Sequence, residues 1–216
     1  MSPAALPHVV AWHDVDDPAL PLVVLLHGRG SNEEEIIGLA SLLPAGASYA
    51  AVRAPIAEGG GYAWFANRGI GRPLPDSLRT QMDWFRSWLD EVAPANRPVI
   101  VVGFSGGAAF AGGLLLDDPG RFAATAILFG TLPFDAGVST EPGRLAGAHV
   151  LVIHGDQDQV IPADLLAATW SYLTTDAGAS TLAIRDQGGH GISPASATAL
   201  GEWLGDQLRA ATGTAS

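Results

Sequence analysis

A serine lies where a predicted strand turns into a predicted helix, a position that suits a nucleophile. Ser105 follows the apolar run 98–102 and precedes the segment 107–116, which has helical spacing. Gly103 and Gly107 flank it, and a Cβ at either position of such a tight turn would clash with the neighbouring strand or helix. The bare G-x-S-x-G pattern is weak evidence in a chain with 27 glycines, and a serine that merely caps the helix is the alternative. The flanking strand and helix favour a nucleophilic serine.

A serine hydroxyl needs a base that removes its proton and a carboxylate that holds this base in one tautomer. His190 lies in a glycine-flanked loop after the last predicted strand, and so at the same sheet edge as Ser105; a plain loop histidine is the alternative. Asp156 and Asp158 both follow the predicted strand 150–153. Spacing does not separate them: one would orient the histidine, and the other would satisfy turn N–H groups. The order Ser, Asp, His is the one expected for the α/β-hydrolase fold.

Two backbone N–H groups are candidates for an oxyanion hole. The N–H of Gly106 stands at the start of the helix after the nucleophile, where the helix dipole favours a developing negative charge. The second is assigned to Arg29, in the glycine-rich turn directly after an early strand. This turn also suits the start of a capped helix, since Ser31 and Glu34 have capping-box spacing. The neighbouring His27 is interpreted as a buried structural histidine.

The elements that must position these residues alternate along the chain. Short apolar runs predict buried strands, and segments with helical spacing separate them. The predicted strands are 22–26, 98–102, 123–129, 150–153 and 181–184, and the predicted helices are 33–43, 76–92, 107–116, 163–173 and 194–210. This alternation predicts an α/β fold with a mostly parallel sheet and helices on both faces. An antiparallel edge strand is expected near 9–12.

Two stretches interrupt the alternation and are candidate pocket loops. Residues 57–75 are rich in glycine and aromatic side chains, and 132–148 have little regular pattern. The whole chain, 1–216, is expected to form one domain. Its last residues, 211–216, are expected to be a frayed tail.

Composition excludes several classes of function. A formal net charge of −11 leaves no basic patch for a nucleic acid or an anionic membrane. Cysteine is absent, so a thiolate nucleophile and a Cys-ligated metal are excluded. The sequence has no signal-peptide pattern and no apolar run long enough to span a bilayer, which favours a cytoplasmic protein without membrane insertion. A secreted mature form stays open, and the sequence permits a homodimer.

Four motifs together resemble the phospholipase/carboxylesterase family of small bacterial serine esterases, which includes the acyl-protein thioesterases. They are the oxyanion loop 26–30 (LHGRG), the nucleophile motif 103–107 (GFSGG), the acid motif 154–162 (HGDQDQVIP) and the base motif 189–191 (GHG). The resemblance covers nearly the whole chain and implies an α/β-hydrolase fold without a large cap domain. It also places the acid at Asp158, which leaves Asp156 as the turn former.

The chain departs from the family pattern at the oxyanion loop and the nucleophile. Gly106 stands where members often have Gln, and Arg29 where they have an apolar residue. Because only backbone N–H groups would act there, catalysis should survive; the Arg29 side chain is expected to face solvent, with an acidic substrate group as the alternative. Trp64 and Phe65 match an aromatic pair of the family and would line an acyl pocket or anchor a long loop. Leu132 invites the same two interpretations.

The resemblance implies a serine carboxylesterase that forms an acyl-enzyme, with Ser105, His190 and Asp158 as its triad. The expected substrate is a small to medium uncharged carboxylic ester, because the proposed pocket residues are aromatic and aliphatic. No metal or organic cofactor is needed. A thioesterase or lysophospholipase with the same triad is the alternative, and a non-catalytic ligand-binding protein of this fold is another.

Overall fold

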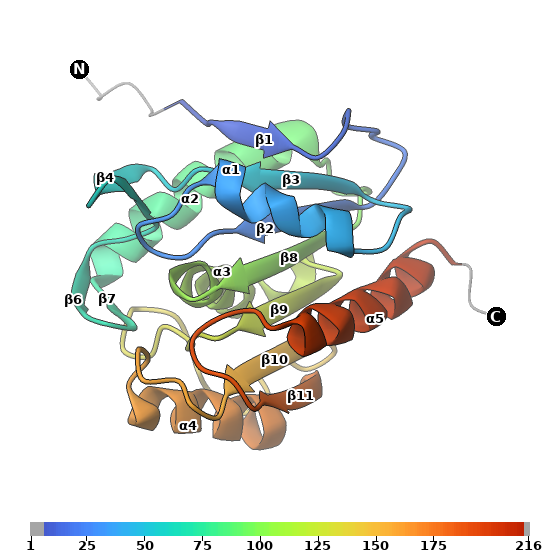
Figure 1. Cartoon of the computed structure of the whole chain (residues 1–216). Helices are drawn as coiled ribbons and strands as arrows, with labels where there is room; N and C mark the ends of the chain where they lie inside the picture. Colours follow the sequence, from blue (N-terminus) through green and yellow to red (C-terminus); the bar gives the residue numbers. More distant parts are fainter. Residues whose placement is uncertain (1–6, 214–216) are drawn as a thin grey trace.

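A seven-stranded sheet forms the centre of the computed structural model, which describes residues 7–213 (Figure 1). Every neighbouring pair of strands is parallel except the edge pair β1–β3. The mostly parallel α/β sheet with an antiparallel edge strand is therefore confirmed, and within the described residues no large cap domain covers it. In spatial order the strands are β1 (Val10–Trp12), β3 (Ser48–Val52), β2 (Leu22–Leu26), β8 (Val99–Phe104), β9 (Ala124–Leu128), β10 (His149–Gly155) and β11 (Ser180–Asp186).

Helices cover both faces of the sheet, as the unbroken apolar strands require. In β2, Leu22 and Val24 face one core cluster, whereas Val23 and Leu25 face the other. Figure 1 shows α1 and α5 in front of the sheet and α2 and α3 behind it. The helices are α1 (Glu33–Ile36), α2 (Pro75–Val92), α3 (Gly106–Asp117), α4 (Ala163–Ser171) and α5 (Pro194–Ala211).

The helix α3 carries the nucleophile turn at its start and is buried along nearly its whole length. It lies between the sheet and α2, so every residue from Gly107 to Leu116 is withdrawn from solvent. Such a helix is apolar all round, which is expected of a helix inside a core. No helix among residues 7–213 is both long enough and apolar enough to cross a membrane.

Several elements differ in detail from the sequence prediction. The predicted helix 33–43 is a single α-helical turn followed by a 3₁₀ helix, Ile37–Leu42, and the predicted helix 163–173 ends as α4 before a π-helical turn, Tyr172–Asp176. A further 3₁₀ turn, Pro119–Arg121, follows α3. The strand β3 was not predicted at all. Of the predicted frayed tail 211–216, Ala211 still belongs to α5, and residues 214–216 lie outside the described part of the chain.

The predicted pocket loop 57–75 is organised into two small antiparallel ribbons. The strand β4 (Ile56–Glu58) pairs with β5 (Gly61–Ala63), and β6 (Asn67–Gly69) pairs with β7 (Arg72–Pro73). Both ribbons lie at the end of the sheet where the parallel strands finish (Figure 1). They therefore stand beside the sheet edge on which the nucleophile is expected.

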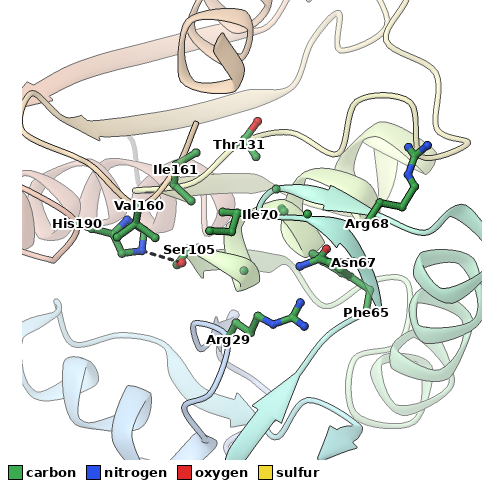
Figure 2. A pocket seen from close by; sticks show the side chains of 14 residues that line it. Arg29, Phe65, Asn67, Arg68, Ile70, Ser105, Thr131, Val160, Ile161 and His190 are labelled. Carbon is green, nitrogen blue, oxygen red and sulfur yellow. Dashed lines mark hydrogen bonds between the residues drawn. The ribbon is translucent and has the colours of Figure 1, made fainter. Parts of the chain in front are cut away.

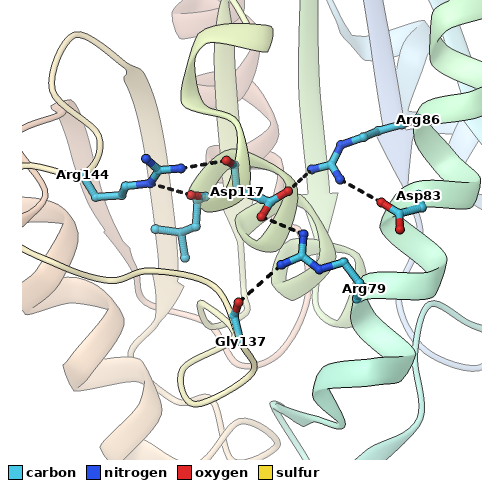
Figure 3. Close-up of polar contacts among 7 residues, drawn as sticks. Arg79, Asp83, Arg86, Asp117, Gly137 and Arg144 are labelled. Carbon is cyan, nitrogen blue, oxygen red and sulfur yellow. Dashed lines mark hydrogen bonds and ion pairs between the residues drawn. The ribbon is translucent and has the colours of Figure 1, made fainter.

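An arginine cluster ties the second pocket loop, 132–148, to the helices behind the sheet (Figure 3). Arg79 and Arg86 of α2 pair with Asp117, the last residue of α3, at 2.9 and 2.7 Å. Arg144 of the loop donates to the last two carbonyls of α3, and Arg79 also donates to the Gly137 carbonyl at 3.4 Å. Burial raises the pKa of Asp117, but the two arginines outweigh it and hold that pKa below its usual value.

Candidate functional site

The turn between β8 and α3 holds Ser105 in a backbone conformation that side chains rarely adopt. Its φ and ψ are 54° and −114°, and its N–H donates to the Leu128 carbonyl at 2.9 Å. The glycines on either side are required by space: a Cβ on Gly103 would lie 2.3 Å from the Gly107 carbonyl oxygen, and a Cβ on Gly107 would lie 2.3 Å from the Leu26 carbonyl oxygen. The turn thus exposes one hydroxyl at the start of α3.

Three predicted residues meet beside this turn, and Figure 2 shows two of them, Ser105 and His190. His190 Nε2 lies 2.8 Å from Ser105 Oγ, and His190 Nδ1 lies 2.8 Å from Asp158 Oδ2. The Asp158 side chain is fully buried, whereas the imidazole is 16% exposed. Because an ionised carboxylate only accepts, Nδ1 carries the ring proton and Nε2 accepts from the serine hydroxyl. The chain of hydrogen bonds thus runs from hydroxyl to imidazole to carboxylate.

The turn after β10 holds the buried carboxylate in its ionised form. Burial raises the pKa of Asp158, but hydrogen bonds from His190 and from the N–H groups of Ile161 and Val160 outweigh it, so the pKa lies below its usual value. The two N–H groups donate to Oδ1 at 3.1 and 2.8 Å. Asp158 therefore performs the turn-forming role that was expected of Asp156.

Asp156 has a different position from the one the sequence predicted. Its half-exposed carboxylate pairs with Arg185 at 2.7 Å and accepts no turn N–H. The Arg185 guanidinium also lies over the Trp170 ring, 5.3 Å from its centroid. The side chain of Asp156 thus faces solvent and does not contact His190.

The two predicted oxyanion donors lie next to each other at the nucleophile. A Cβ on Gly106 would be 3.2 Å from the Arg29 nitrogen, so the two backbones pass closely there. Within residues 7–213, neither N–H donates to a protein acceptor. Both are therefore available to a ligand at Ser105, and the N-terminus of α3 adds its dipole at this point.

The Arg29 side chain is exposed, as expected, and it is also held by a carboxylate of the protein. Its Nε and Nη2 atoms donate to the two carboxylate oxygens of Glu58 at 2.5 and 2.6 Å. The pair is partly exposed on the wall of the pocket, where Figure 2 shows the guanidinium opposite Asn67. The charge of Arg29 is thus neutralised by a bidentate partner from β4.

The helix after the oxyanion loop begins with a different cap from the predicted one. The Asn32 side chain accepts from the Glu35 N–H at 2.9 Å and is the N-cap of α1. Ser31 instead donates its hydroxyl to the Glu35 carboxylate at 2.5 Å. The expected capping box of Ser31 and Glu34 is therefore wrong by one residue.

Two buried histidines near the site are held by backbone groups. His27 Nδ1 donates to the Gly28 carbonyl at 2.7 Å, and its Nε2 accepts from the Ala54 N–H at 3.0 Å. Burial lowers its pKa, and burial also lowers the pKa of His154, to about 4. His154 Nε2 lies 3.0 Å from the Gly130 carbonyl. Both rings are neutral at neutral pH, and the structural role expected for His27 agrees with this geometry.

A pocket of about 630 Å³ opens beside Ser105 and His190 (Figure 2). Phe65 of the predicted aromatic pair belongs to its lining, as does Arg29. Sequence reasoning missed several other lining residues, although most of them follow a predicted site residue or lie in the predicted loop. These are Asn67, Arg68, Gly69, Ile70, Gly71, Ala109, Thr131, Val160 and Ile161.

A second, smaller pocket of about 360 Å³ meets the first at the nucleophile. The two share Arg29, Ser105 and His190. Its other lining residues are Gly28, Ser31, Glu35, Ile36, Phe104 and Ile192. The nucleophile thus lies where two hollows of the surface meet.

Trp64 and Leu132 lie in the core and not in the pocket lining. Trp64 is 1% exposed, stacks on Phe110 with ring centroids 4.6 Å apart, and donates its indole N–H to the His27 carbonyl at 2.8 Å. Leu132 is fully buried in the same core cluster. The geometry thus favours loop anchoring for these two residues and a pocket wall for Phe65 alone.

The site contains no evident metal centre. Among residues 7–213, no group of three or more His, Asp or Glu side chains is arranged to hold a metal ion. The groups available for chemistry at the pocket are the serine hydroxyl, the imidazole, the carboxylate and two backbone N–H groups.

Comparison with known sequences gives one family match and two curated relatives. The phospholipase/carboxylesterase profile matches residues 10–206. NocK of Nocardia uniformis subsp. tsuyamanensis, provisionally named an esterase, is 34% identical over 162 residues, which are 69% of this chain and 44% of NocK. MhqD of Bacillus subtilis, provisionally named a hydrolase, is 26% identical over 191 residues, 87% of this chain and 94% of MhqD. The matched region thus spans less than half of NocK.

Comparison with solved structures gives the same architecture. The carboxylesterase of Bacillus cereus superimposes with a TM-score of 0.80 and 24% identity, over 95% of this chain and 96% of that protein. At this identity the likeness shows the fold alone. The fold is that of the α/β hydrolases.

Proposed function

Because this chain belongs to the phospholipase/carboxylesterase family and is an ester hydrolase, we propose that it is a serine carboxylesterase with Ser105, His190 and Asp158 as its catalytic triad. The observation that carries the proposal is the unbroken hydrogen-bond chain from hydroxyl to imidazole to buried carboxylate, with both links at 2.8 Å. This arrangement has the geometry that activates a serine.

In the first step, Ser105 Oγ attacks the ester carbonyl carbon while His190 Nε2 takes the hydroxyl proton. The carbonyl oxygen becomes an oxyanion, which accepts hydrogen bonds from the N–H groups of Arg29 and Gly106. Asp158 keeps the proton on Nδ1 and stabilises the imidazolium that forms. Its low pKa supports this role, since the carboxylate stays ionised across the neutral range.

In the second step, the imidazolium of His190 gives its proton to the leaving alkoxide oxygen, the bond from carbon to that oxygen breaks, and an acyl-enzyme remains on Ser105. Water then attacks the acyl carbon while His190 Nε2 takes one of its protons. The bond from that carbon to Ser105 Oγ breaks, the imidazolium returns the proton to Oγ, and the acid leaves the regenerated enzyme. All of these proton transfers pass through His190 Nε2, and neither half of the reaction needs a cofactor.

We assign small to medium uncharged carboxylic esters as the substrate class. Phe65, Ile70, Val160 and Ile161 supply an apolar lining to the larger pocket. The bidentate partner of Arg29 supports an uncharged substrate, because it leaves that guanidinium without a free charge for a substrate acid.

The test compares wild type with Ser105→Ala on p-nitrophenyl acetate and butyrate. We expect the variant to lose at least about 10³-fold in kcat, because the nucleophile is gone. Ser171→Ala, on the exposed end of α4, is the matched control and should retain wild-type rates. Hydrolysis that survives in Ser105→Ala contradicts the mechanism, and faster turnover of thioesters or lysophospholipids than of simple esters contradicts the substrate assignment.

Two further predictions stand beside this proposal, a single domain over residues 1–216 and a cytoplasmic location, and the sequence also permits a homodimer. Size-exclusion chromatography with light scattering tests the last of these.

A further inference from the structure

The loop that carries His190 is built from residues that restrain a backbone poorly. Residues 187–193 (QGGHGIS) connect β11 to α5 and contain three glycines, two of which flank His190 directly (Figure 1). Glycine leaves the backbone more conformations than any other residue. The imidazole nevertheless lies 2.8 Å from each of two partners. The loop must therefore be held by contacts with groups outside it.

A buried carboxylate at the end of β11 holds this loop on both sides of His190. Asp186 is the last residue of β11 and is 8% exposed. Its Oδ1 accepts from the Gly188 N–H at 2.7 Å, and its Oδ2 accepts from the Ser193 hydroxyl. These two donors lie two residues before and three residues after His190. One side chain thus fixes both ends of the segment that carries the imidazole.

The far end of the loop is anchored in a packed helix. Ser193 is the N-cap of α5: its Oγ accepts from the Ser196 N–H at 3.1 Å, and its own N–H donates to Ser196 Oγ at 2.8 Å. Farther along α5, Leu200 and Leu204 are fully buried in the core on that face of the sheet. Through Ser193, Asp186 therefore ties the loop to a rigid element.

The same residue connects the loop of the base to the turn of the acid. The Asp186 carbonyl accepts from the Asp156 N–H at 2.7 Å, and the Gly188 carbonyl accepts from the Gln157 N–H at 2.9 Å. The next residue along that turn is Asp158, which pairs with His190. Because the Asp186 side chain fixes the peptide that enters Gly188, it also helps to set how the acid and the base face each other.

Asp186 has the protonation state that this role needs. Hydrogen bonds from the Ser193 hydroxyl and the Gly188 N–H outweigh burial, and they hold the pKa of Asp186 below its usual value. An ionised carboxylate accepts at both oxygens, so it can hold the two donors at once.

We infer that Asp186 is a positioning residue, which fixes the loop 187–193 so that His190 stays within hydrogen-bond distance of Ser105 and Asp158 together. This inference rests on the proposed function and adds to it the group that holds the base in place. Asp186 itself moves no proton; it acts through Gly188 and Ser193.

The test compares p-nitrophenyl butyrate with ethyl butyrate in Asp186→Ala, which removes both links. The p-nitrophenolate ion leaves without a proton, whereas ethoxide needs one from His190. A displaced imidazole should therefore lower kcat/KM by about 30- to 100-fold on the ethyl ester and by only about three- to tenfold on the p-nitrophenyl ester. A smaller fraction of folded protein would lower both rates by the same factor.

Two further variants are the controls. Asp186→Asn is the conservative variant: its amide oxygen can accept from the Gly188 N–H and its amide nitrogen can donate to the Ser193 hydroxyl, so both rates should return to within about threefold of wild type. Asp16→Ala removes an ion pair with the buried Arg97, at the opposite end of the sheet from the nucleophile. It should lower the free energy of unfolding and leave the ratio of the two rates unchanged.

Ser193→Gly tests one link alone if Asp186→Ala does not fold. Glycine is tolerated at a helix N-cap, so α5 should be retained while the link to Asp186 Oδ2 is lost. We expect the same unequal loss at a smaller size, about three- to tenfold on the ethyl ester.

Equal factors for the two esters, or unchanged rates, in folded Asp186→Ala would overturn the inference, and so would equal factors or unchanged rates in Ser193→Gly where that variant is the one measured. Ser105→Ala separates the two levels. If it is inactive while the Asp186 variants lose both rates equally, only the role of Asp186 is contradicted. If Ser105→Ala hydrolyses either ester, the proposed function itself is wrong.

Discussion

Replacing Asp158 by Asn tests the proposed triad at its buried end. The amide oxygen of Asn can keep the two bonds from the Val160 and Ile161 N–H groups, which fixes the amide nitrogen on the side of His190. This amide nitrogen donates a hydrogen bond, so His190 Nδ1 must accept it. The ring proton then lies on Nε2, the nitrogen that faces Ser105. The base facing Ser105 is then lost, although the turn is retained.

The expected magnitude follows from that tautomer. A base held in the wrong tautomer lowers kcat by about 10³–10⁴, which is about 4 to 5 kcal/mol of transition-state stabilisation. The KM for p-nitrophenyl butyrate should change little, because Asp158 does not line the pocket. Asp156→Asn is the matched control: its side chain is 42% exposed and pairs with the exposed Arg185, so kcat should change by less than about threefold.

The assay measures kcat and KM for both variants near neutral pH, with thermal unfolding to establish that each is folded. A larger loss in Asp156→Asn than in Asp158→Asn would overturn the assignment of the acid. A loss of less than about tenfold in a folded Asp158→Asn would refute the tautomer argument itself.

Three further predictions concern the turn, the helix cluster and the oxyanion loop. Gly103→Ala should destabilise by at least about 1–3 kcal/mol in urea unfolding, because its Cβ would meet a backbone oxygen at 2.3 Å, whereas Gly38→Ala, with open space around it, should not. Asp117→Asn should lower stability by about 1–2 kcal/mol at pH 7, whereas Asp83→Asn, 64% exposed, should have little effect. The pKa of Asp117 is lower in the folded protein than in the unfolded chain. The stability difference between wild type and Asp117→Asn should therefore be complete above the ordinary carboxyl pKa, and it should vanish as the pH falls through the pKa of Asp117 in the folded protein. Arg29→Ala should keep kcat within about tenfold, because only its backbone N–H is needed.

Each of these has a contradicting result. Equal stability of Gly103→Ala and Gly38→Ala would remove the steric argument for the nucleophile turn. If Asp117→Asn remains less stable than wild type in acid, the charge of Asp117 is not what stabilises the arginine cluster. A loss of more than about 100-fold in Arg29→Ala would give its side chain a direct part in catalysis.

The sheet and most helices followed from sequence because their signals are local. The run Leu22–Leu26 is apolar without a break, as a strand buried on both faces must be, and this alone predicts a covered parallel sheet. The strand β3, Ser48–Val52, was missed because serine and alanine lower its β propensity, and only its neighbours β1 and β2 bury it. Its identity as a strand is thus set by tertiary contacts.

The position of a site residue could be predicted where the residues of a turn determine it. It could not be predicted where the direction of a side chain decides whether that side chain lines the pocket. Ser105 is held by its flanking glycines, a local constraint visible in the sequence. Trp64 and Phe65 are adjacent and both are buried in one core cluster, yet only Phe65 also lines the pocket, and the order of the two residues in the sequence does not specify this difference. Asn67 carried no signal, because its place in the pocket lining depends on the ribbon that the folded chain forms there.

The most direct test of the account is stoichiometric labelling with a fluorophosphonate, followed by intact-protein mass measurement. An activated serine attacks phosphorus and displaces fluoride, so wild type should gain one adduct per chain, located at Ser105, and Ser105→Ala should gain none. An unlabelled wild type, or equal labelling of the two proteins, would contradict the claim that Ser105 is the nucleophile.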